Sequence, residues 1–269
     1  MSKRLGWLSR SYIGVVMAFL YAPILVLIAY SFNANKSRGM WTGFTFKWYE
    51  QLFQNDIIMQ SLYNTLFIAV VSSIIATVLG TAAAIGIYSM GRRARGIVMN
   101  ATYLPIINPE IVTGVSLMLL FVMFGISSGY TTLILAHITF NTPYVILNVM
   151  PKLRQMDKHV YEAALDLGCN RRQAFFKVIV PEISPGIISG LLMSFTYSLD
   201  DFIISYFVSS STSQTLPITI YSMTRKKVSP EINALSTIIF ILVLVVLIIV
   251  NINGARREKQ EIKRYASFM

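Results

Sequence analysis

The sequence predicts an all-α polytopic membrane protein with six transmembrane helices, and three observations lead to this fold class. Hydrophobic residues make up 55% of the 269-residue chain, charged residues only 13%, and the mean hydropathy is +0.60. This composition leaves too little polar surface for a water-soluble globule. The apolar runs must be helical, because lipid cannot satisfy backbone hydrogen bonds and no segment shows the alternation of a membrane barrel.

Six apolar stretches are long enough to cross the hydrocarbon core, which takes about 20 helical residues. They form one transmembrane domain over residues 1–269 and cover residues 12–32, 62–90, 97–124, 130–150, 184–208 and 233–253. The first stretch follows three basic residues, as a secretory signal peptide would. Its apolar core of about twenty residues is too long for a signal peptide and has no cleavage pattern, which favours a retained helix.

The basic residues predict the orientation of the chain. Of the 23 lysines and arginines, 17 lie at the N-terminus, at 92–95, in 151–183 or after residue 253. Because cytoplasmic loops carry the excess of basic residues, both termini and the 151–183 loop are expected in the cytoplasm. The formal charge of +11 is therefore attributed to membrane orientation rather than to nucleic-acid binding. With Cys169 as the one cysteine, neither an intramolecular disulfide nor a metal site is expected.

Two segments on the opposite side are longer than simple connections. Residues 33–60 carry apolar residues at near-helical spacing, which predicts a short helix at the membrane surface. Trp48 in this segment is either an aromatic-belt residue or part of a substrate entrance. Residues 209–232 begin with a polar run that predicts a flexible connection, and Ser229 with Pro230 suits the start of the last helix.

The loop between the fourth and fifth spans carries the most specific local pattern. It predicts two short helices, with Asp157 as the cap of the first and Gly168 as its end. Asn170 and Gln173 have the spacing of a capping box for the second helix. An apolar stripe beneath a polar face gives the first helix the form of a helix that docks into another protein's groove.

This loop resembles the Glu-Ala-Ala loop of binding-protein-dependent ABC importers, with glycine six residues after the glutamate and proline thirteen residues after the glycine. In that family the loop is a coupling helix that docks into a cleft of the cytoplasmic ATPase. The resemblance therefore implies an ATPase-coupling role for Glu162, Ala163, Ala164, Gly168 and Pro181. The alternative is an ordinary connecting helical hairpin.

The resemblance extends over essentially the whole chain and is closest to spermidine/putrescine importer permeases of the PotC type. Matching landmarks include Tyr21 to Ile24, His137 to Phe140, Ser194 to Asp201 and Ser229 to Leu235. They imply the type I ABC importer (MetI-like) permease fold with a cytoplasmic coupling helix, in a bacterial inner membrane. They also imply a second, PotB-like permease, a PotA-like ATPase homodimer and an extracytoplasmic, PotD-like polyamine-binding protein.

The chain itself is not expected to hydrolyse ATP. A P-loop needs a glycine-rich turn that ends in Gly-Lys-Ser/Thr, and no Gly-Lys pair occurs in the sequence. The expectation is a transport subunit without a cofactor of its own, whose ATP and magnesium are bound by the partner ATPase.

Three acidic residues lie within the predicted spans: Glu110, Asp200 and Asp201. Glu110 lies 15 residues after Arg95, and Asp200 lies 15 residues after Pro185. At about 1.5 Å per residue, both are roughly 22 Å from the cytoplasmic side. Acids within a membrane usually face a pathway or a partner, and no lysine or arginine lies within the six spans. This pattern favours a cationic substrate such as a polyamine.

The predicted substrate pathway comprises Glu110, Tyr197, Ser198, Asp200, Asp201 and Trp48. Adjacent helical residues point about 100° apart, so one of the two aspartates is expected to serve structure. Glu110 has the alternative of a protonated acid bonded to a carbonyl that Pro105 or Pro109 frees. His137 is expected to pack in the interior rather than bind a ligand, and the prolines at 23, 105, 109 and 143 are expected to interrupt their spans.

The sequence leaves three other functions open. The first is the same transporter with another cargo, such as a metal, a quaternary amine or an anion, although the lack of intramembrane base argues against an anion. The second is a stand-alone cation channel or carrier, which the coupling loop disfavours. The third is a membrane scaffold without a transport role.

Overall fold

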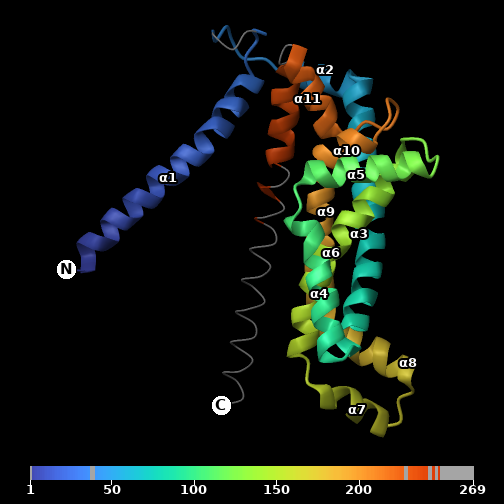
Figure 1. The fold of residues 1–269 in the computed structure, drawn as a ribbon. Coiled ribbons are helices and arrows are strands. Elements are labelled where there is room, and N and C mark those ends of the chain that lie inside the picture. The colour runs from blue at the N-terminus through green and yellow to red at the C-terminus, as the bar shows by residue number, and fades with distance from the viewer. Residues whose placement is uncertain (1, 37–39, 227–229, 242–243, 246–247, 249–269) are drawn as a thin grey trace. The chain divides into compact units, whose positions relative to one another are not determined.

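The computed structural model describes residues 2–36, 40–226, 230–241, 244–245 and 248, and the chain is all-α in this part (Figure 1). It divides into two compact units. The first consists of residues 1–59 with 223–269, and the second of residues 60–222. The predicted helices before residue 60 are confirmed as α1 (Ser2–Ser31) and α2 (Lys47–Gln54). From Asp56 onward the described residues form α3 to α11 and the helix Pro230–Ile241.

Four helices in the described part are long and apolar enough to cross a membrane. They are the α1 segment Arg10–Ser31, α3 (Asp56–Ser89), α6 (Tyr130–Gln155) and the helical run Arg171–Asp200. A bent helix pair at the third predicted span is a fifth candidate, and the sixth predicted span begins as the helix Pro230–Ile241. The rest of that span and the basic tail lie outside the described residues. The predicted number of six spans therefore stays a prediction.

Residues 60–222 form a bundle in which α9 (Val180–Asp200) packs along α6. Small residues recur every four positions on the buried side of α9, at Gly186, Gly190, Ser194 and Ser198. Such spacing lets two membrane helices approach closely, because van der Waals packing rather than water exclusion holds them together. A Cβ atom added to Gly186 would lie 2.9 Å from the Asn148 carbonyl oxygen of α6.

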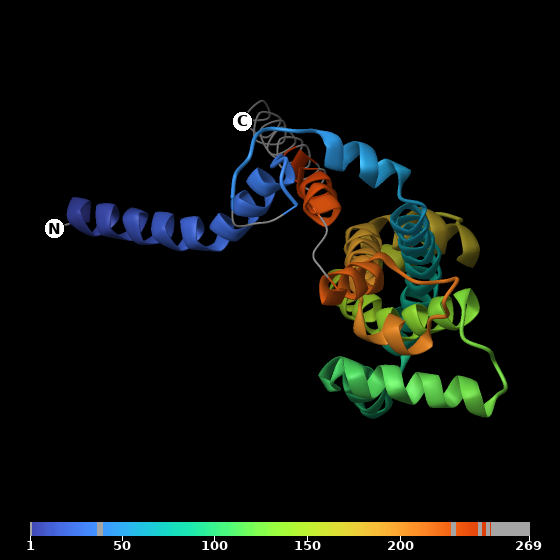
Figure 2. The ribbon, with the colours of Figure 1, turned by 90° about the horizontal axis from the view of Figure 1, so that it is seen from above.

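The third predicted span is broken in its middle. α4 (Arg92–Ile107) ends before Asn108, and α5 (Glu110–Met123) continues after a bend of 101°. In Figure 2, where α3 and α9 are seen nearly end on, α5 lies lengthwise across the view. Of the four prolines expected to interrupt spans, only Pro109 stands at a break, and Pro23, Pro105 and Pro143 lie inside continuous helices.

The fifth predicted span, 184–208, also differs from the structure. Its helix ends at Asp200, and the chain turns at Asp201 into the short helix α10 (Ile203–Val208). The second loop helix is not separate, because α8 (Arg171–Ala174) runs through the π-helical turn η1 (Phe175–Ile179) into α9. Pro181 explains the π turn, since proline lacks the N–H of an α-helical hydrogen bond.

Residues 209–222 are held in place by polar contacts. The sequence had predicted a flexible connection here. Ser213 is buried and accepts a hydrogen bond from the Ser210 amide at 3.0 Å. The hydroxyl of Thr65 on α3 accepts from the Leu216 amide at the start of α11 (Leu216–Lys226). Ser229, expected to precede the last helix, lies outside the described residues.

In the first unit, the segment that follows α1 folds around Asn33. The Asn33 side chain bonds the backbone of Met40 and Thr42, and Trp48 of α2 donates from its indole nitrogen to the Asn33 carbonyl oxygen at 2.6 Å. Trp48 is 2% exposed. The exposed aromatic residues described in this segment include Trp41, Phe44, Phe46 and Phe53, whereas Trp48 is a buried anchor rather than an aromatic-belt residue.

The packing of α9 on α6 yields a stability prediction. Gly186→Ala is expected to lower the free energy of unfolding by about 1–3 kcal/mol, because its methyl group would meet the backbone of Asn148 and Val149. The measurement is the thermal unfolding midpoint of the purified protein in detergent. Gly86→Ala in α3 is the control, since a Cβ at Gly86 meets no atom within 4 Å and alanine favours the helix. Equal midpoints for the two variants would contradict the close packing.

Candidate functional site

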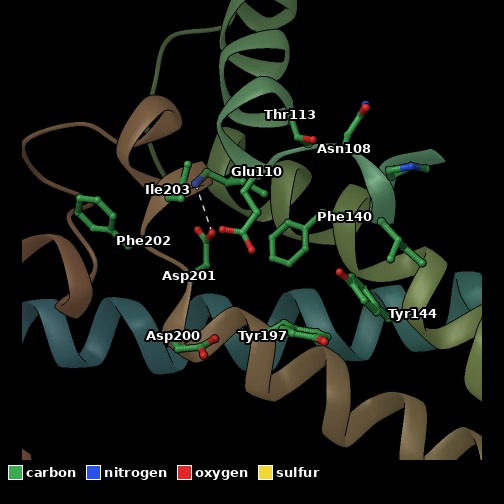
Figure 3. Close-up of a pocket in the computed structure, with 13 residues that line it drawn as sticks. Asn108, Glu110, Thr113, Phe140, Tyr144, Tyr197, Asp200, Asp201, Phe202 and Ile203 are labelled. Atoms are coloured by element: carbon green, nitrogen blue, oxygen red, sulfur yellow. Dashed lines mark hydrogen bonds between the residues drawn. The ribbon is translucent and has the colours of Figure 1, made fainter. Parts of the chain in front are cut away.

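A pocket of about 400 Å³ lies where the two broken spans of the second unit meet (Figure 3). The end of α4, the start of α5, the middle of α6 and the end of α9 with the start of α10 all contribute to it. The lining residues are Pro105, Ile106, Asn108, Glu110, Thr113, Phe140, Tyr144, Tyr197, Asp200, Asp201, Phe202, Ile203 and Ile204. None of these described lining residues is a lysine or an arginine.

The pocket brings together the three acids that the sequence singled out. Glu110 is the first residue of α5, Asp200 is the last residue of α9, and Asp201 follows in the turn. The side chains of Glu110 and Asp201 point toward one another across the pocket in Figure 3. Glu110 and Asp200 are exposed residues, whereas the Asp201 side chain is 5% exposed. The common depth expected from the sequence is consistent with this placement.

Asp201 makes several hydrogen bonds within its own turn. Its Oδ2 accepts from the amide of Ser205 at 2.7 Å and from the hydroxyl of Ser205 at 2.6 Å, and its Oδ1 accepts from the amide of Ile204 at 3.3 Å. The Nε2 atom of the buried His137 lies 3.6 Å from Oδ2. His137 is thus an interior side chain, as expected, but it lies directly behind an acid of the pocket.

The helix ends around the pocket favour positive charge. The C-termini of α4 and α9 both reach it, and the last carbonyls of a helix carry partial negative charge. The two N-termini at the breaks, which would attract an anion, are met by acids of the chain itself: Glu110 in the first turn of α5 and Asp201 at α10. Broken helices at membrane depth commonly form the ion and substrate sites of transporters.

Aromatic rings form much of the remaining wall. The rings of Tyr144 on α6 and Tyr197 on α9 lie 4.4 Å apart between centroids, and Phe140 lies one turn before Tyr144. Phe202 packs against Tyr221 of α11 at 4.7 Å. These faces can bind methylene groups, and the tyrosine rings can contribute cation–π attraction to an ammonium group. Sequence reasoning had selected Tyr197 among these residues.

Sequence reasoning missed Asn108, Thr113, Phe140, Tyr144 and Phe202 as pocket residues. The signal that could have found the first of them is the Asn108-Pro109 dipeptide, which marks a probable helix boundary inside a span. Tyr144 and Phe140 carried no comparable signal. Aromatic residues on a membrane helix also occupy lipid-facing and core positions, so their presence does not mark a pocket.

Two residues of the predicted pathway do not line this pocket. Ser198 is 2% exposed, accepts from the Asn141 side chain at 2.7 Å and lies 3.2 Å from the Ser72 hydroxyl, so it joins α3, α6 and α9. Trp48 belongs to the buried anchor at Asn33. Their place in a substrate pathway stays a prediction. The other four residues of the predicted pathway, Glu110, Tyr197, Asp200 and Asp201, line the pocket.

The loop around α7, between α6 and α9, has the capping structure that its sequence predicted. Asp157 accepts from the His159 amide at the start of α7 (Lys158–Asp166), and Gly168 has a φ of +87°, which suits glycine. The amide of Gly168 bonds the Leu165 carbonyl and that of Cys169 bonds the Ala164 carbonyl, which together form a Schellman motif. The capping box of Asn170 and Gln173 is also confirmed.

The residues of α7 are divided between the protein and the solvent. Glu162 and Ala163 are exposed, whereas Ala164 is buried against the protein. His159 lies 3.5 Å from the Glu162 carboxylate on the exposed side. Within residues 60–222, α7 lies at one end of the bundle and α5 lies toward the other (Figure 1). The loop therefore presents an exposed face that carries Glu162 and lies away from the pocket.

Comparison with known proteins defines the class of this membrane protein. Residues 76–256 match the family described as binding-protein-dependent transport system inner membrane component. The match covers both broken spans and the loop around α7. The chain belongs to this family of ABC importer permeases, so it is a membrane component of such a transport system rather than its ATPase.

The similar proteins narrow the comparison further. The chain is 39% identical to the spermidine/putrescine transport system permease protein PotC of Haemophilus influenzae, over 90% of this chain and 95% of that protein. It is 41% identical to the putrescine transport system permease protein PotI of Escherichia coli K12, over 91% of this chain and 90% of that protein. A PotC of the same strain is 38% identical.

Solved structures confirm the fold. A bacterial ABC transporter involved in the import of the acidic polysaccharide alginate superimposes with a TM-score of 0.71, over 93% of this chain and 95% of that chain, at 13% identity. The predicted all-helical permease fold of type I ABC importers is therefore shown. At this identity the likeness concerns the fold alone.

The electrostatic character of the pocket can be tested by thiol labelling. In a Cys169→Ser background, Thr113→Cys is expected to react about tenfold faster with a cationic methanethiosulfonate than with an anionic one of similar size, because acids and helix C-termini raise the local concentration of cations. The measurement is the labelling rate by mass spectrometry, corrected for the reagents' rates with a free thiol.

The matched control is Ser198→Cys in the same background, since Ser198 is buried and adjacent to Tyr197 without lining the pocket. It is expected to react slowly with both reagents. A preference of Thr113→Cys for the anionic reagent would contradict the cationic character of the site.

Proposed function

We propose that this permease carries a polyamine of the spermidine or putrescine type, and that the acidic pocket is the binding site on its translocation path. The observation that carries the proposal is the convergence of the carboxylates of Glu110 and Asp200 with aromatic walls at two helix breaks, next to Asp201 in the turn. The cargo named for the PotC and PotI relatives agrees with this chemistry.

The pocket suits a cation better than an anion. Its charged lining residues are acidic, and the helix C-termini of α4 and α9 add partial negative charge. An anion would instead require basic side chains or free helix N-termini at this depth. The fold does not decide this, because a permease of the same fold belongs to a transporter for an acidic polysaccharide.

The pocket also suits an elongated organic cation. A polyamine alternates ammonium groups with methylene chains, so it needs separated acids and an apolar surface between them. Glu110 and Asp200 come from different helices, and the ring pair of Tyr144 and Tyr197 supplies apolar and cation–π surface beside them. A compact metal ion would make no use of these aromatic walls.

Transport is proposed to proceed by alternating access. A PotA-like ATPase pair in the cytoplasm closes on ATP and pushes on α7, with Glu162, Ala163, Ala164, Gly168 and Pro181 as the coupling residues. The helical run Arg171–Asp200 leads from this loop to Asp200, which supports a mechanical connection between the two. The bias of basic residues supports a cytoplasmic position for this loop and for both termini.

The complete importer is proposed to contain further subunits. Membership of the family implies an ATPase, a partner permease and a binding protein. We expect the partner to be a PotB-like permease that completes the path, and the extracytoplasmic protein to be a PotD-like polyamine-binding protein. Trp48 and Ser198 belong to the proposed path in a supporting role, Trp48 through the anchor at Asn33 and Ser198 between α3, α6 and α9.

The cargo is tested by uptake of labelled putrescine and spermidine into cells that lack this chain and are rescued by wild type or by variants at equal membrane abundance. Wild type is expected to restore uptake, whereas Asp200→Asn and Glu110→Gln are expected to lose about tenfold or more, because each removes a charge that pairs with an ammonium group. Thr196→Val, at an exposed position one turn before Asp200, is the control. Failure of the wild type to restore polyamine uptake would reject the cargo.

The coupling role is tested with Glu162→Lys in the assembled transporter. This change reverses the charge on the exposed face of α7, so uptake is expected to fall about tenfold or more while ATP hydrolysis and assembly persist. The measurements are uptake and ATPase activity of the same purified complex. Glu182→Lys makes the same charge change at an exposed position outside α7 and serves as the control. Normal uptake by Glu162→Lys would refute the coupling role.

A further inference from the structure

We infer that Asp201 is a positioning residue rather than a cation ligand: its carboxylate caps α10 and is held from behind by His137 through Ser205, which leaves Asp200 and Glu110 to face the substrate. The inference rests on the proposed function in that it divides the acids of that site into two roles.

The first argument is that the hydrogen-bonding capacity of Asp201 is already used. Asp201 has extended backbone angles, φ −61° and ψ 120°, and its side chain accepts from the backbone amides of Ile204 and Ser205 at the start of α10. Phe202, directly before α10, makes no side-chain cap bond, and the Asp201 carboxylate one residue earlier accepts from the first amides as a capping side chain does. These amides have no intrahelical partners, so the carboxylate satisfies groups that lipid could not.

The second argument is the direction of the hydrogen bonds behind Asp201. The Ser205 hydroxyl donates its one proton to Asp201 Oδ2 at 2.6 Å, and the same Ser205 Oγ lies 3.0 Å from His137 Nε2. Ser205 can therefore only accept from His137, which places a proton on Nε2. The result is a directed chain from His137 to Ser205 to Asp201, in which each bond polarises the next.

The third argument is that the three side chains are buried and come from different parts of the fold. His137 and Ser205 are 0% exposed, and the Asp201 side chain is 5% exposed. His137 belongs to α6, Asp201 lies in the turn between α9 and α10, and Ser205 belongs to α10. The chain of bonds thus fastens the second helix break to a neighbouring helix. The His137 ring also packs on Phe140 of the pocket wall, with centroids 5.1 Å apart.

The consequence is a division of labour between two adjacent aspartates. Three donors and the N-terminus of α10 complement the charge of Asp201. Asp200, the last residue of α9, is exposed at the negative end of its helix, and its carboxylate has the amide of its own residue as a donor in place of the three donors of Asp201. A substrate cation is therefore the natural partner of Asp200, and Asp201 holds the turn that presents it.

The test compares substitutions that separate charge from capping. Asn caps helices about as well as Asp, so Asp201→Asn in the complete transporter is expected to keep more than about half of the polyamine uptake rate. Asp200→Asn at equal abundance is expected to lose about tenfold or more. If Asp201→Asn is as inactive as Asp200→Asn, the charge of Asp201 itself is required and the inference is overturned.

The histidine is tested by rescue and by non-additivity. His137→Leu is expected to reduce uptake, and His137→Gln, which keeps an N–H donor, is expected to restore at least part of it. Because His137 acts through Ser205, the combination of His137→Leu with Ser205→Ala is expected to be no worse than the more severe single variant. Additive losses, or equal losses for His137→Leu and His137→Gln, would overturn the proposed chain.

Unfolding midpoints of the purified transporter give a readout that does not depend on the cargo. Asp201→Leu removes the cap and is expected to lower the midpoint, whereas Asp201→Asn and Asp200→Leu are expected to leave it near that of the wild type. An unchanged midpoint for Asp201→Leu would show that there is no cap. If the wild type transports no polyamine, the proposed cargo has failed, and these midpoints still decide the role of Asp201.

Discussion

The inability of lipid to hydrogen-bond the peptide backbone governs the architecture of this chain. Two of its spans are interrupted, and the amides and carbonyls at the interruptions need partners from the protein itself. At the second break, the Asp201 carboxylate accepts a hydrogen bond from the Ser205 amide at the start of α10. At the end of α10, the Val208 carbonyl accepts one from the Thr132 hydroxyl of α6 at 2.7 Å. At the first break, the Pro109 carbonyl accepts from the amide of Val112 at 2.9 Å. Of these partners, Asp201 also lines the pocket.

The long contact between α6 and α9 runs between the pocket and the loop around α7. The small residues along α9 let the two backbones approach closely, so the pair offers little room to deform between its ends. A helical run that starts at Arg171 beside the loop ends at Asp200 in the pocket. Within this run, η1 is the irregular turn, and Pro181 accounts for it by lacking an N–H. The fold thus places one stiff element between the two regions that the proposed mechanism must couple.

Fold and cargo are set by different features of the molecule. The fold is shared with a transporter that takes an acidic polysaccharide, at 13% identity, so helix arrangement alone carries no information about charge. In this chain the charge preference arises at the breaks, where acids meet the N-termini of α5 and α10 while the C-termini of α4 and α9 remain open to the pocket.

The sequence by itself determined the class of fold, the capping of the coupling loop and the set of acids in the membrane, because these follow from local rules. Hydropathy and length specify spans, and a cap such as Asp157 or Gly168 acts within a few residues of its own position. Only the tertiary structure decided where the spans break and which role each acid takes. Polar residues stand at both breaks, but their sequence does not specify a bend such as the 101° between α4 and α5, because polar residues such as Asn141 also lie inside a continuous helix. Asp200 and Asp201 are chemically identical, and only contacts with Ser205 and with His137 on another helix distinguish them, since side-chain roles in a bundle depend on neighbours far apart in sequence.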